Sequence, residues 1–405
     1  MELFQAVTVE RARELLAAHW PGGGKETVPL ERAAGRVLAE SPASPLDLPP
    51  FTRSTVDGFA VRAADTFGAS ASLPAYLSLA GEVRIGHPFG GRVEPGQAVV
   101  LPTGGMLPEG ADAAVMVENT EPVDEGTVAV LRPAAPGENL ILKGEDLRAG
   151  QSVLPAGRRL RPADLALLAA CGFREVSVRL PLRVGIVSTG DELAVPGTPL
   201  SPGCIYDSNS YSLFGLVSAD GGLATLYGPV ADDPRLLRRT VAEALESNQV
   251  VLLSGGSSVG TRDYTLTVLE ELGGILLFHG VAIGPGKPTL AAALPDRLLV
   301  GLPGHPASAM VVYTVLLSPL VVRGSYPDPD RTVIRARLDR NLASRSGRED
   351  YVPVRLVNRD GETWAEPLLG KSGLIALLTQ AQGLARIPLE EEGKVRGDPV
   401  EVMLF

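Results

Sequence analysis

Carboxylate side chains follow three apolar segments of the sequence, at positions where buried strands would end. Glu192 lies in a run of polar residues after the first segment, Asp232 comes just after the second, and Asp263 lies beyond the third. Carboxylates that converge repel one another unless a cation lies between them, and oxygen is the ligand atom that Mg²⁺ prefers. The pattern therefore predicts a magnesium-type oxygen site, provided that the three segments are strands of one sheet.

Two glycine-containing segments carry groups that suit a phosphate. In the segment from Ser254 to Gly260, glycines let backbone N–H groups approach a ligand closely, and a helix is expected to begin just beyond it. In the segment from Gly284 to Pro288, the ammonium group of Lys287 lies on a rigid turn. Together with the carboxylates, these segments predict a site for a phosphorylated substrate.

Other reactive residue types do not form comparable groups. The sequence has only 4 histidines, and no His/Cys cluster has the spacing of zinc ligands, so a zinc site is not expected. Cys204 has no neighbouring base that would activate a thiol, and Cys171 is expected to pack in a helix. Asp233 precedes a helical segment and is expected to cap it.

The chemistry requires a sheet whose strands end at one common edge. Between 181 and 325, apolar segments of about four to eight residues alternate with amphipathic helices, which is the pattern of a parallel sheet covered on both faces. Ligands bind such sheets outside the carboxyl ends of the strands. We therefore predict a doubly wound parallel α/β domain over 181–325, with the site at that edge.

The rest of the chain has different periodicities. Residues 1–45 together with 146–180 are predicted to form a helical linking domain whose two helices pack against each other. Residues 46–145 alternate short apolar runs with Gly/Pro turns, which indicates a small β domain, and 326–405 show a period of two, which indicates a C-terminal β module. The predicted fold class is thus α/β multidomain, with two β-rich modules and an N-terminal helical segment.

Composition limits the classes of function. The 405 residues are 45% hydrophobic and 21% charged, a globular balance that excludes intrinsic disorder. A net charge of −10 provides no overall basic field for nucleic acid or an anionic membrane. The longest apolar stretch, Ala307 to Val322, falls short of the roughly 20 residues of a membrane span and is predicted to be a buried helix. With 2 cysteines and no leader before Glu10, the protein is expected to be cytoplasmic.

The motif series resembles that of the molybdopterin molybdotransferases, the MoeA and gephyrin E-domain family, along essentially the whole chain. In the α/β region the matching segments are Ser188-Thr189-Gly190-Asp191-Glu192-Leu193, Asp207-Ser208-Asn209, Ser254-Gly255-Gly256-Ser257-Ser258-Val259-Gly260 with Asp263-Tyr264, Pro285-Gly286-Lys287-Pro288 and Gly301-Leu302-Pro303-Gly304. Outside that region they are Ser54-Thr55-Val56-Asp57-Gly58-Phe59-Ala60, Pro102-Thr103-Gly104 and Gly144-Glu145-Asp146.

The resemblance implies a homodimer that inserts molybdenum from molybdate into adenylated molybdopterin, using Mg²⁺, and releases AMP. It implies four acidic residues around metal and molybdate, of which Glu192 and Asp232 bind the metal: Asp57, Glu192, Asp232 and Asp263. It implies substrate contacts along the same motifs and from the C-terminal module: Thr103, Asp146, Ser188, Thr189, Gly190, Asp191, Ser254 to Gly260, Pro285, Gly286, Lys287, Pro303, Gly304 and Ser372.

Three positions depart from the family pattern: Val56 replaces a common Met, Gly284 a common Lys, and His305 a common Asn. The second departure removes a cation, which weakens anion binding unless an arginine such as Arg262 substitutes for it.

Two alternative functions were weighed against the molybdotransferase. A molybdopterin adenylyltransferase would need only about 150 to 200 residues, and a non-enzymatic scaffold would not need the full acidic set. The sequence leaves open whether an adenylyltransferase docks on the chain.

Overall fold

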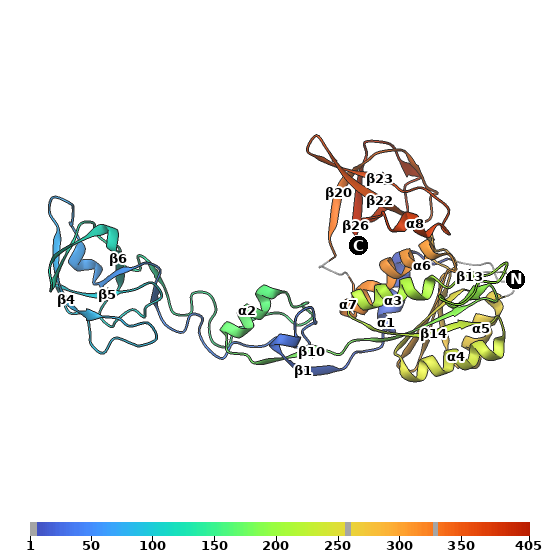
Figure 1. Ribbon diagram of the computed structural model, residues 1–405, viewed down its shortest axis with the longest axis horizontal. Coiled ribbons are helices and arrows are strands. Elements are labelled where there is room, and N and C mark those ends of the chain that lie inside the picture. Colours follow the sequence, from blue (N-terminus) through green and yellow to red (C-terminus); the bar gives the residue numbers. More distant parts are fainter. Residues whose placement is uncertain (1–5, 256–260, 327–330) are drawn as a thin grey trace. The chain divides into compact units, whose positions relative to one another are not determined.

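The computed structural model describes residues 6–255, 261–326 and 331–405, and its contacts divide the chain into two compact units (Figure 1). The first unit comprises Met1–Glu26, Gly35–Val37 and Arg179–Phe405, and the second comprises Thr27–Ala34 and Leu38–Val178. The structure thus groups the N-terminal helix with the α/β region, whereas the other domain boundaries predicted from the sequence stay predictions.

A six-stranded sheet forms the centre of the first unit, with the strand order β14-β11-β15-β19-β18-β16. Four of its strands run parallel, as predicted, whereas β18 runs antiparallel to both of its neighbours. The bounds are Arg183–Thr189 for β11, Leu223–Val230 for β14, Val250–Gly255 for β15, Ile275–His279 for β16, Leu290–Leu294 for β18 and Arg297–Leu302 for β19. The sequence analysis did not predict β18 as a strand of its own, because only the two-residue turn Pro295-Asp296 lies between β18 and β19.

Helices cover both faces of this sheet, which confirms the doubly wound α/β architecture. Alternate residues of β11 point to opposite faces: Ile186 belongs to one buried cluster and Val187 to the other. The first cluster includes residues of α1, α3, α6 and α7, and the second includes residues of α4 and α5. The bounds are Val9–Ala18 for α1, Asn209–Ala219 for α3, Pro234–Ser247 for α4, Thr261–Glu271 for α5, Pro306–Val312 for α6 and Ser318–Arg323 for α7.

The N-terminal helix α1 packs on the α/β core. Its buried residues Val9, Ala12 and Leu16 lie in the same cluster as the central strands. The helix expected to pack against it is α2 (Pro162–Ala170), whose Leu168 belongs to a cluster in the second unit. The prediction that these two helices pack together is therefore wrong. The apolar face of α1 packs on the central sheet of the first unit instead.

The apolar segment near residue 315 is a core helix with an irregular middle turn. Between α6 and α7, residues Tyr313–Leu317 form a π-helical turn. Pro319 has no N–H to donate to the Val315 carbonyl, and Arg13 of α1 donates to this oxygen through Nε (3.3 Å) and Nη2 (3.1 Å). Pro306–Arg323 is long and apolar enough to cross a membrane, but 83% of it is buried inside the protein, in agreement with the predicted buried helix.

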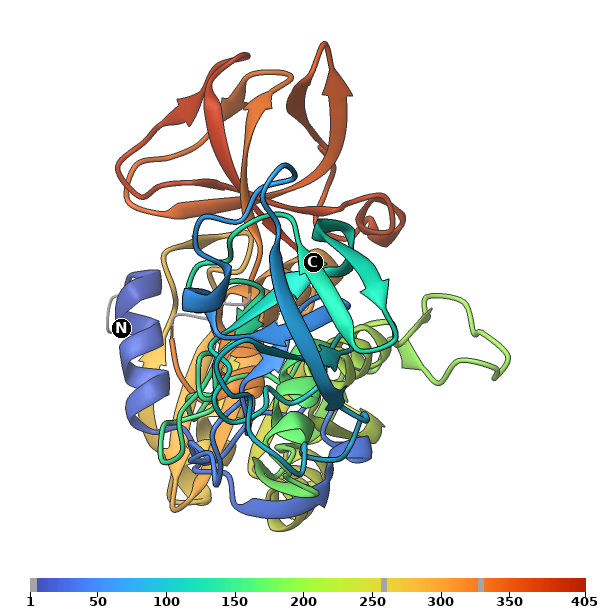
Figure 2. The same ribbon diagram turned by 90° about the vertical axis from the view of Figure 1, so that its left-hand side faces the viewer.

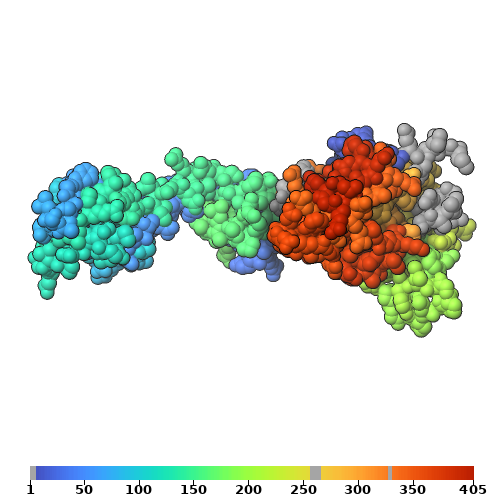
Figure 3. Space-filling view, turned by 90° about the horizontal axis from the view of Figure 1, so that it is seen from above, coloured from blue at the N-terminus to red at the C-terminus, as the bar shows by residue number. Residues whose placement is uncertain are grey.

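The C-terminal module of the first unit is a β-sheet that closes on itself, because β22 pairs with β23 and also with β24. Figure 2 shows its strands in orange and red, and Figure 3 shows the module on one face of the unit. The α/β region adds β17 (Ile283–Gly284), which pairs with β22. The module's elements are β20 Val333–Leu338, β21 Leu342–Ala343, β22 Glu349–Arg359, β23 Glu362–Pro367, α8 Ile375–Leu378, β24 Gly383–Ile387, β25 Gly393–Lys394 and β26 Pro399–Leu404.

The second unit contains the predicted β domain and a helix beside a two-stranded ribbon. The ribbon pairs β1 (Lys25–Pro29) with β10 (Glu175–Arg179), and Cys171 is fully buried at the end of α2, as expected. The six-stranded sheet has the order β6-β3-β5-β4-β8-β7. Its bounds are Gly58–Val61 for β3, Ala75–Glu82 for β4, Gln97–Leu101 for β5, Ala113–Met116 for β6, Thr120–Asp124 for β7 and Thr127–Val130 for β8, while β2 (Arg53–Ser54) pairs with β9 (Leu140–Ile141).

Candidate functional site

A cavity of about 650 Å³ lies at the carboxyl ends of β11, β14 and β15 in the first unit. Its wall is completed by the start of α3, the start of α6 and two residues of the C-terminal module, Gly373 and Ile375. The predicted site residues that line it are Ser188, Thr189, Gly190, Glu192, Asp232, Ser254, Gly255 and Gly304. Residues that are far apart in sequence thus meet at the edge of the sheet where the sequence placed the chemistry.

Three carboxylate residues line the cavity, Glu192, Asp207 and Asp232, and the loop after β11 orients the last of them. Thr189 donates a hydrogen bond from Oγ1 to Asp232 Oδ1 (2.8 Å), and the Asp232 N–H donates to Asp191 Oδ1 (3.0 Å). Asp191 does not line the cavity, so its carboxylate holds the backbone of Asp232. These contacts fix Asp232 relative to the strand that carries Thr189 and leave its carboxylate at the cavity wall.

The oxygen donors at the cavity fit Mg²⁺ better than a softer metal. Among the described residues, no three His, Cys, Asp or Glu side chains are close enough to form a complete metal site. Mg²⁺ is usually bound by one or two carboxylates, with waters and substrate phosphates as its other ligands. Glu192 and Asp232 supply two such carboxylates. Asp263 belongs to α5, but its side chain lies outside the described residues.

The glycine-rich loop begins where β11 and β15 approach each other closely. Gly255 has φ +117°, and a Cβ built on it would lie 2.1 Å from the Thr189 carbonyl oxygen. No residue with a side chain fits at this position without moving the backbone of β11. Gly256, Ser257, Ser258, Val259 and Gly260 lie outside the described residues, so the predicted phosphate loop is described only up to Gly255.

The motif Asp207-Ser208-Asn209 contributes three cavity residues that were not among the predicted site residues. Asp207 is 3% exposed and accepts a hydrogen bond from the Ser210 N–H (3.0 Å), while the hydroxyls of Ser210 and Ser188 lie 2.6 Å apart. Asn209 is also buried, at 8% exposed. The sequence resemblance included this motif, which was the signal by which these residues could have been found.

Ser372 of the C-terminal module contacts a residue of the cavity wall, His305, and does not line the cavity itself. Its hydroxyl oxygen lies 3.1 Å from His305 Nδ1, and its carbonyl accepts a hydrogen bond from the Ala307 N–H (3.1 Å). His305 itself lines the cavity. The residue that replaces the common Asn therefore connects the last strand-to-helix loop of the α/β region to the C-terminal module.

The backbone at Gly284 has no room for a side chain. In the pairing of β17 with β22, Gly284 lies opposite Asp350, and a Cβ on Gly284 would be 1.8 Å from Asp350 Oδ1. Arg348 forms an ion pair with Asp350, with Nε 2.9 Å from Oδ1. Arg348, Lys371 and Ser372 line a second cavity of about 350 Å³, together with Gly284.

Arg348 is therefore the cation that the structure places beside Gly284. Sequence reasoning missed Arg348 because only the pairing of β17 with β22 brings it there, and the Arg262 side chain lies outside the described residues.

Pro285 lines the same cavity, whereas Gly286 and Pro303 are buried. Lys287 is exposed and lines neither cavity.

In the second unit, Thr103 holds the carboxylate of Asp57. The Thr103 N–H (2.8 Å) and hydroxyl (3.0 Å) both donate hydrogen bonds to Asp57 Oδ1. Hydrogen bonds to the charged form lower the pKa of Asp57 below its ordinary value. Asp146 is exposed, and its N–H donates to the Leu48 carbonyl (3.0 Å). Asp57 and Thr103, which the resemblance implied as separate site residues, thus contact each other within this unit.

We expect Thr103→Val to raise the pKa of Asp57 toward that of a free aspartate. The variant keeps the backbone donor and loses the hydroxyl donor, so the pKa should rise and yet stay below the ordinary value. Carbon-detected NMR titration of the Asp57 carboxyl measures this shift. Thr55→Val is the matched control, because the Thr55 hydroxyl donates to the Asn139 carbonyl instead. An Asp57 pKa that does not move in Thr103→Val would contradict the assignment.

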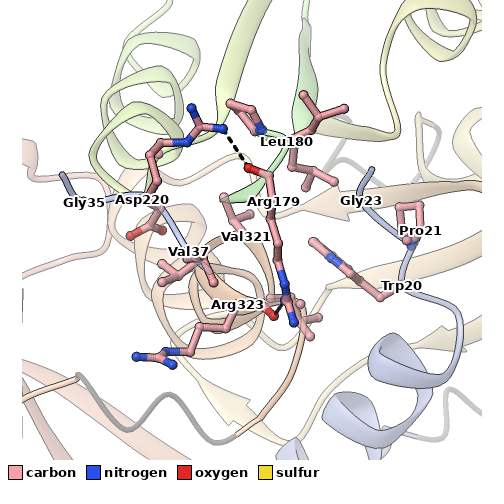
Figure 4. Close-up of a pocket in the computed structure, with 18 of the residues that line it drawn as sticks. Trp20, Pro21, Gly23, Gly35, Val37, Arg179, Leu180, Asp220, Val321 and Arg323 are labelled. Carbon is pink, nitrogen blue, oxygen red and sulfur yellow. Dashed lines mark hydrogen bonds between the residues drawn. The ribbon is translucent and has the colours of Figure 1, made fainter. Parts of the chain in front are cut away.

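A separate cavity of about 350 Å³ lies beside the end of α7 and contains none of the predicted site residues (Figure 4). Its arginines contact backbone carbonyls: Arg36 Nη2 donates to the Arg179 carbonyl (2.7 Å), and Arg179 donates to the Arg323 carbonyl. Arg36 also forms an ion pair with Glu26 (2.6 Å). These contacts join three segments of the first unit, around Arg36, Arg179 and Arg323. The cavity between them is therefore a structural feature.

Asp233 caps α4, as expected from the sequence. Its Oδ1 accepts hydrogen bonds from the N–H groups of Arg235 (2.7 Å) and Leu236 (3.1 Å). The Leu236 and Arg235 donors hold the pKa of Asp233 below its ordinary value. The two neighbouring aspartates therefore have different positions, because Asp232 lines the cavity and Asp233 begins the helix.

Comparisons with known proteins cover nearly the whole chain. Residues 7–172 match the model of the MoeA N-terminal region (domain I and II), 185–323 that of a probable molybdopterin binding domain, and 335–405 that of the MoeA C-terminal region (domain IV). Molybdopterin molybdenumtransferase from Nostoc sp. is 36% identical over 93% of this chain and 88% of its own length. The enzyme of the same name from Bacillus subtilis is 32% identical over 95% and 90%.

Among solved structures, a molybdopterin biosynthesis moeA protein from Pyrococcus horikoshii superimposes with a TM-score of 0.85 at 32% identity. That comparison covers 99% of this chain and 100% of the other.

Proposed function

The chain belongs to the MoeA family of molybdopterin molybdenumtransferases, and we propose that it inserts molybdenum from molybdate into adenylated molybdopterin, with Mg²⁺, and releases AMP. Membership makes it a transferase of molybdenum cofactor biosynthesis. The metal requirement, the adenylated substrate and the release of AMP are the parts that this proposal adds.

The observation that carries the proposal is the cavity at the carboxyl ends of β11, β14 and β15. It combines the carboxylates of Glu192 and Asp232 with the hydroxyls of Ser188, Thr189 and Ser254. Its volume of about 650 Å³ is in the range of small-molecule sites. A site with this composition suits a substrate that carries both phosphate groups and hydrogen-bonding ring atoms.

The chain's own residues would act by binding and by positioned charge. Glu192 and Asp232 would hold Mg²⁺, which neutralises charge on phosphoryl oxygens when it is bound. Thr189 keeps Asp232 directed by its 2.8 Å hydrogen bond, so the carboxylate needs little rearrangement. Lys287 and the loop that begins at Ser254 would bind the phosphates. The positive groups permit a chain with a net charge of −10 to bind anionic substrates.

The full-length family match disfavours the two alternatives. An adenylyltransferase of the predicted size would not need the N-terminal and C-terminal MoeA regions, both of which match here. A scaffold without activity would not need the carboxylates that line the cavity. Docking of an adenylyltransferase and a cytoplasmic location stay predictions of the sequence.

The release of AMP tests the proposal directly. The protein is incubated with adenylated molybdopterin and Mg²⁺, with and without molybdate, and AMP is measured by chromatography. We expect AMP only when both Mg²⁺ and molybdate are present. Formation of adenylated molybdopterin from ATP would support the adenylyltransferase instead, and the absence of either reaction would favour the scaffold.

We also propose that the enzyme is a homodimer in which both units contribute carboxylates to catalysis. Asp57 belongs to the second unit and Asp232 to the first. Suppose that each site takes Asp57 from one chain of the dimer and Asp232 from the other. Asp57→Asn and Asp232→Asn, each inactive alone, should then regain activity when they are mixed, at up to about one site in two of each mixed dimer. Subunit exchange is checked with two affinity tags. Exchange without recovered activity would show that one chain supplies both residues.

A further inference from the structure

The start of α3 connects the ends of three central strands. Ser210 contacts Ser188 at the end of β11, with 2.6 Å between the hydroxyl oxygens. Asn209 Nδ2 donates to Ser254 Oγ near the end of β15 (2.7 Å) and to the Gly304 carbonyl after β19 (2.8 Å). One buried amide thus links the end of β15 to the loop after β19, although Ser254 and Gly304 are 50 residues apart in sequence.

The hydrogen-bond partners determine which way the Asn209 amide faces. The Gly304 carbonyl can only accept, so the group that contacts it must be the NH₂ of the amide. The same NH₂ has a second hydrogen, which is used by Ser254 Oγ. Both hydrogens are therefore used within the protein, and the carbonyl oxygen Oδ1 is turned away from these two partners.

The carbonyl oxygen of Asn209 is buried and has no hydrogen-bond partner among the described residues. A buried acceptor without a donor is unfavourable in a folded protein, and such groups are commonly satisfied by water or by a ligand. Asn209 lines the same cavity as Glu192 and Asp232. The unmatched acceptor therefore belongs to a residue of the cavity wall.

We propose that Asn209 is a positioning residue for the transfer reaction: it joins the end of β15 to the loop after β19 and offers Oδ1 to an N–H donor of the pterin. This inference rests on the proposed function for the identity of the substrate, whereas the loop contacts belong to the protein alone. Neither Asp207 nor Ser210 can replace it, because their side chains contact the helix start and β11 instead.

Two variants test the proposal, Asn209→Ala and Asn209→Asp. Alanine removes both the donors and the acceptor, and aspartate has nearly the same shape but cannot donate to the Gly304 carbonyl. Hydrogen exchange of the protein without substrate should become faster at Ser254, Gly255 and Gly304 in both variants. The affinity for molybdopterin, titrated against folded Asn209→Ala, which alone of the two lacks an acceptor oxygen, should fall about 10-fold, the change expected from losing a hydrogen bond to a ligand.

The matched control is Ser212→Ala, in the same turn of α3. The Ser212 hydroxyl donates only to the Asn209 carbonyl (3.0 Å), so exchange and affinity should equal those of the parent. Unchanged exchange in the Asn209 variants would overturn the loop contact, and unchanged affinity with faster exchange would overturn the substrate role. If the parent itself binds no molybdopterin, the proposed function and the substrate role both fall, and the exchange data still decide the loop contact.

Discussion

We expect Glu192→Gln and Asp232→Asn each to lower the rate of molybdate-dependent AMP release by roughly 10²- to 10³-fold, the usual effect of removing one electrostatic contact to a transition state. Both substitutions keep the size of the side chain and one acceptor oxygen, and remove the charge. The fold should therefore be retained, and the loss should appear in kcat or in the Mg²⁺ concentration needed for half-maximal activity. Steady-state AMP measurements over a range of Mg²⁺ concentrations separate the two effects.

Asp233→Asn is the matched control for this prediction. It removes a carboxylate charge next to Asp232, but Asn also caps helices well, so α4 should keep its start. Its activity should stay close to that of the parent. If Glu192→Gln and Asp232→Asn retain activity within a few fold of the parent, the carboxylates of this cavity do not bind a metal that the reaction needs.

We expect Lys287→Ala to weaken the binding of adenylated molybdopterin by roughly 10- to 150-fold, which corresponds to about 1.5 to 3 kcal/mol for one charge-assisted hydrogen bond. Its neighbours fix the turn that carries it, because the Lys287 carbonyl accepts from the Val281 N–H (3.0 Å) and Thr289 donates to the Gly286 carbonyl (2.6 Å). The effect should therefore come from the ammonium group and not from a change in the turn. Equilibrium titration measures the affinity.

A lysine in the C-terminal module provides the control for Lys287. Lys394 forms an ion pair with Glu391 (2.7 Å) and belongs to none of the motifs that carry the family resemblance, so Lys394→Ala should bind the substrate like the parent. Because exposed charges are screened by salt, the difference between parent and Lys287→Ala should shrink at higher ionic strength. Equal affinities of parent and Lys287→Ala at low salt would show that the phosphates bind elsewhere.

The local pattern of the sequence determined the architecture around the site. The alternation of Ile186 and Val187 between the two buried clusters follows from the period of a strand, and the apolar runs before Glu192 and Asp232 marked where strands end. Asp233 before Pro234 identified the start of α4 because capping depends only on neighbouring residues. The order of the motifs also indicated the family, and the comparisons with family models confirmed it along nearly the whole chain.

Contacts between distant segments were decided only by the tertiary structure. The closeness of Gly284 and Arg348 depends on the pairing of β17 with β22, and the amide of Asn209 reaches Ser254 and Gly304 only because β15 and β19 are neighbours. The packing partner of α1 could not be predicted from the sequence either. An amphipathic pattern shows that one face of a helix is buried, but it does not show which surface covers that face. Periodicity reports the environment of each residue along one element, whereas partners are set by the free energy of all elements packing together, and no local pattern contains that information.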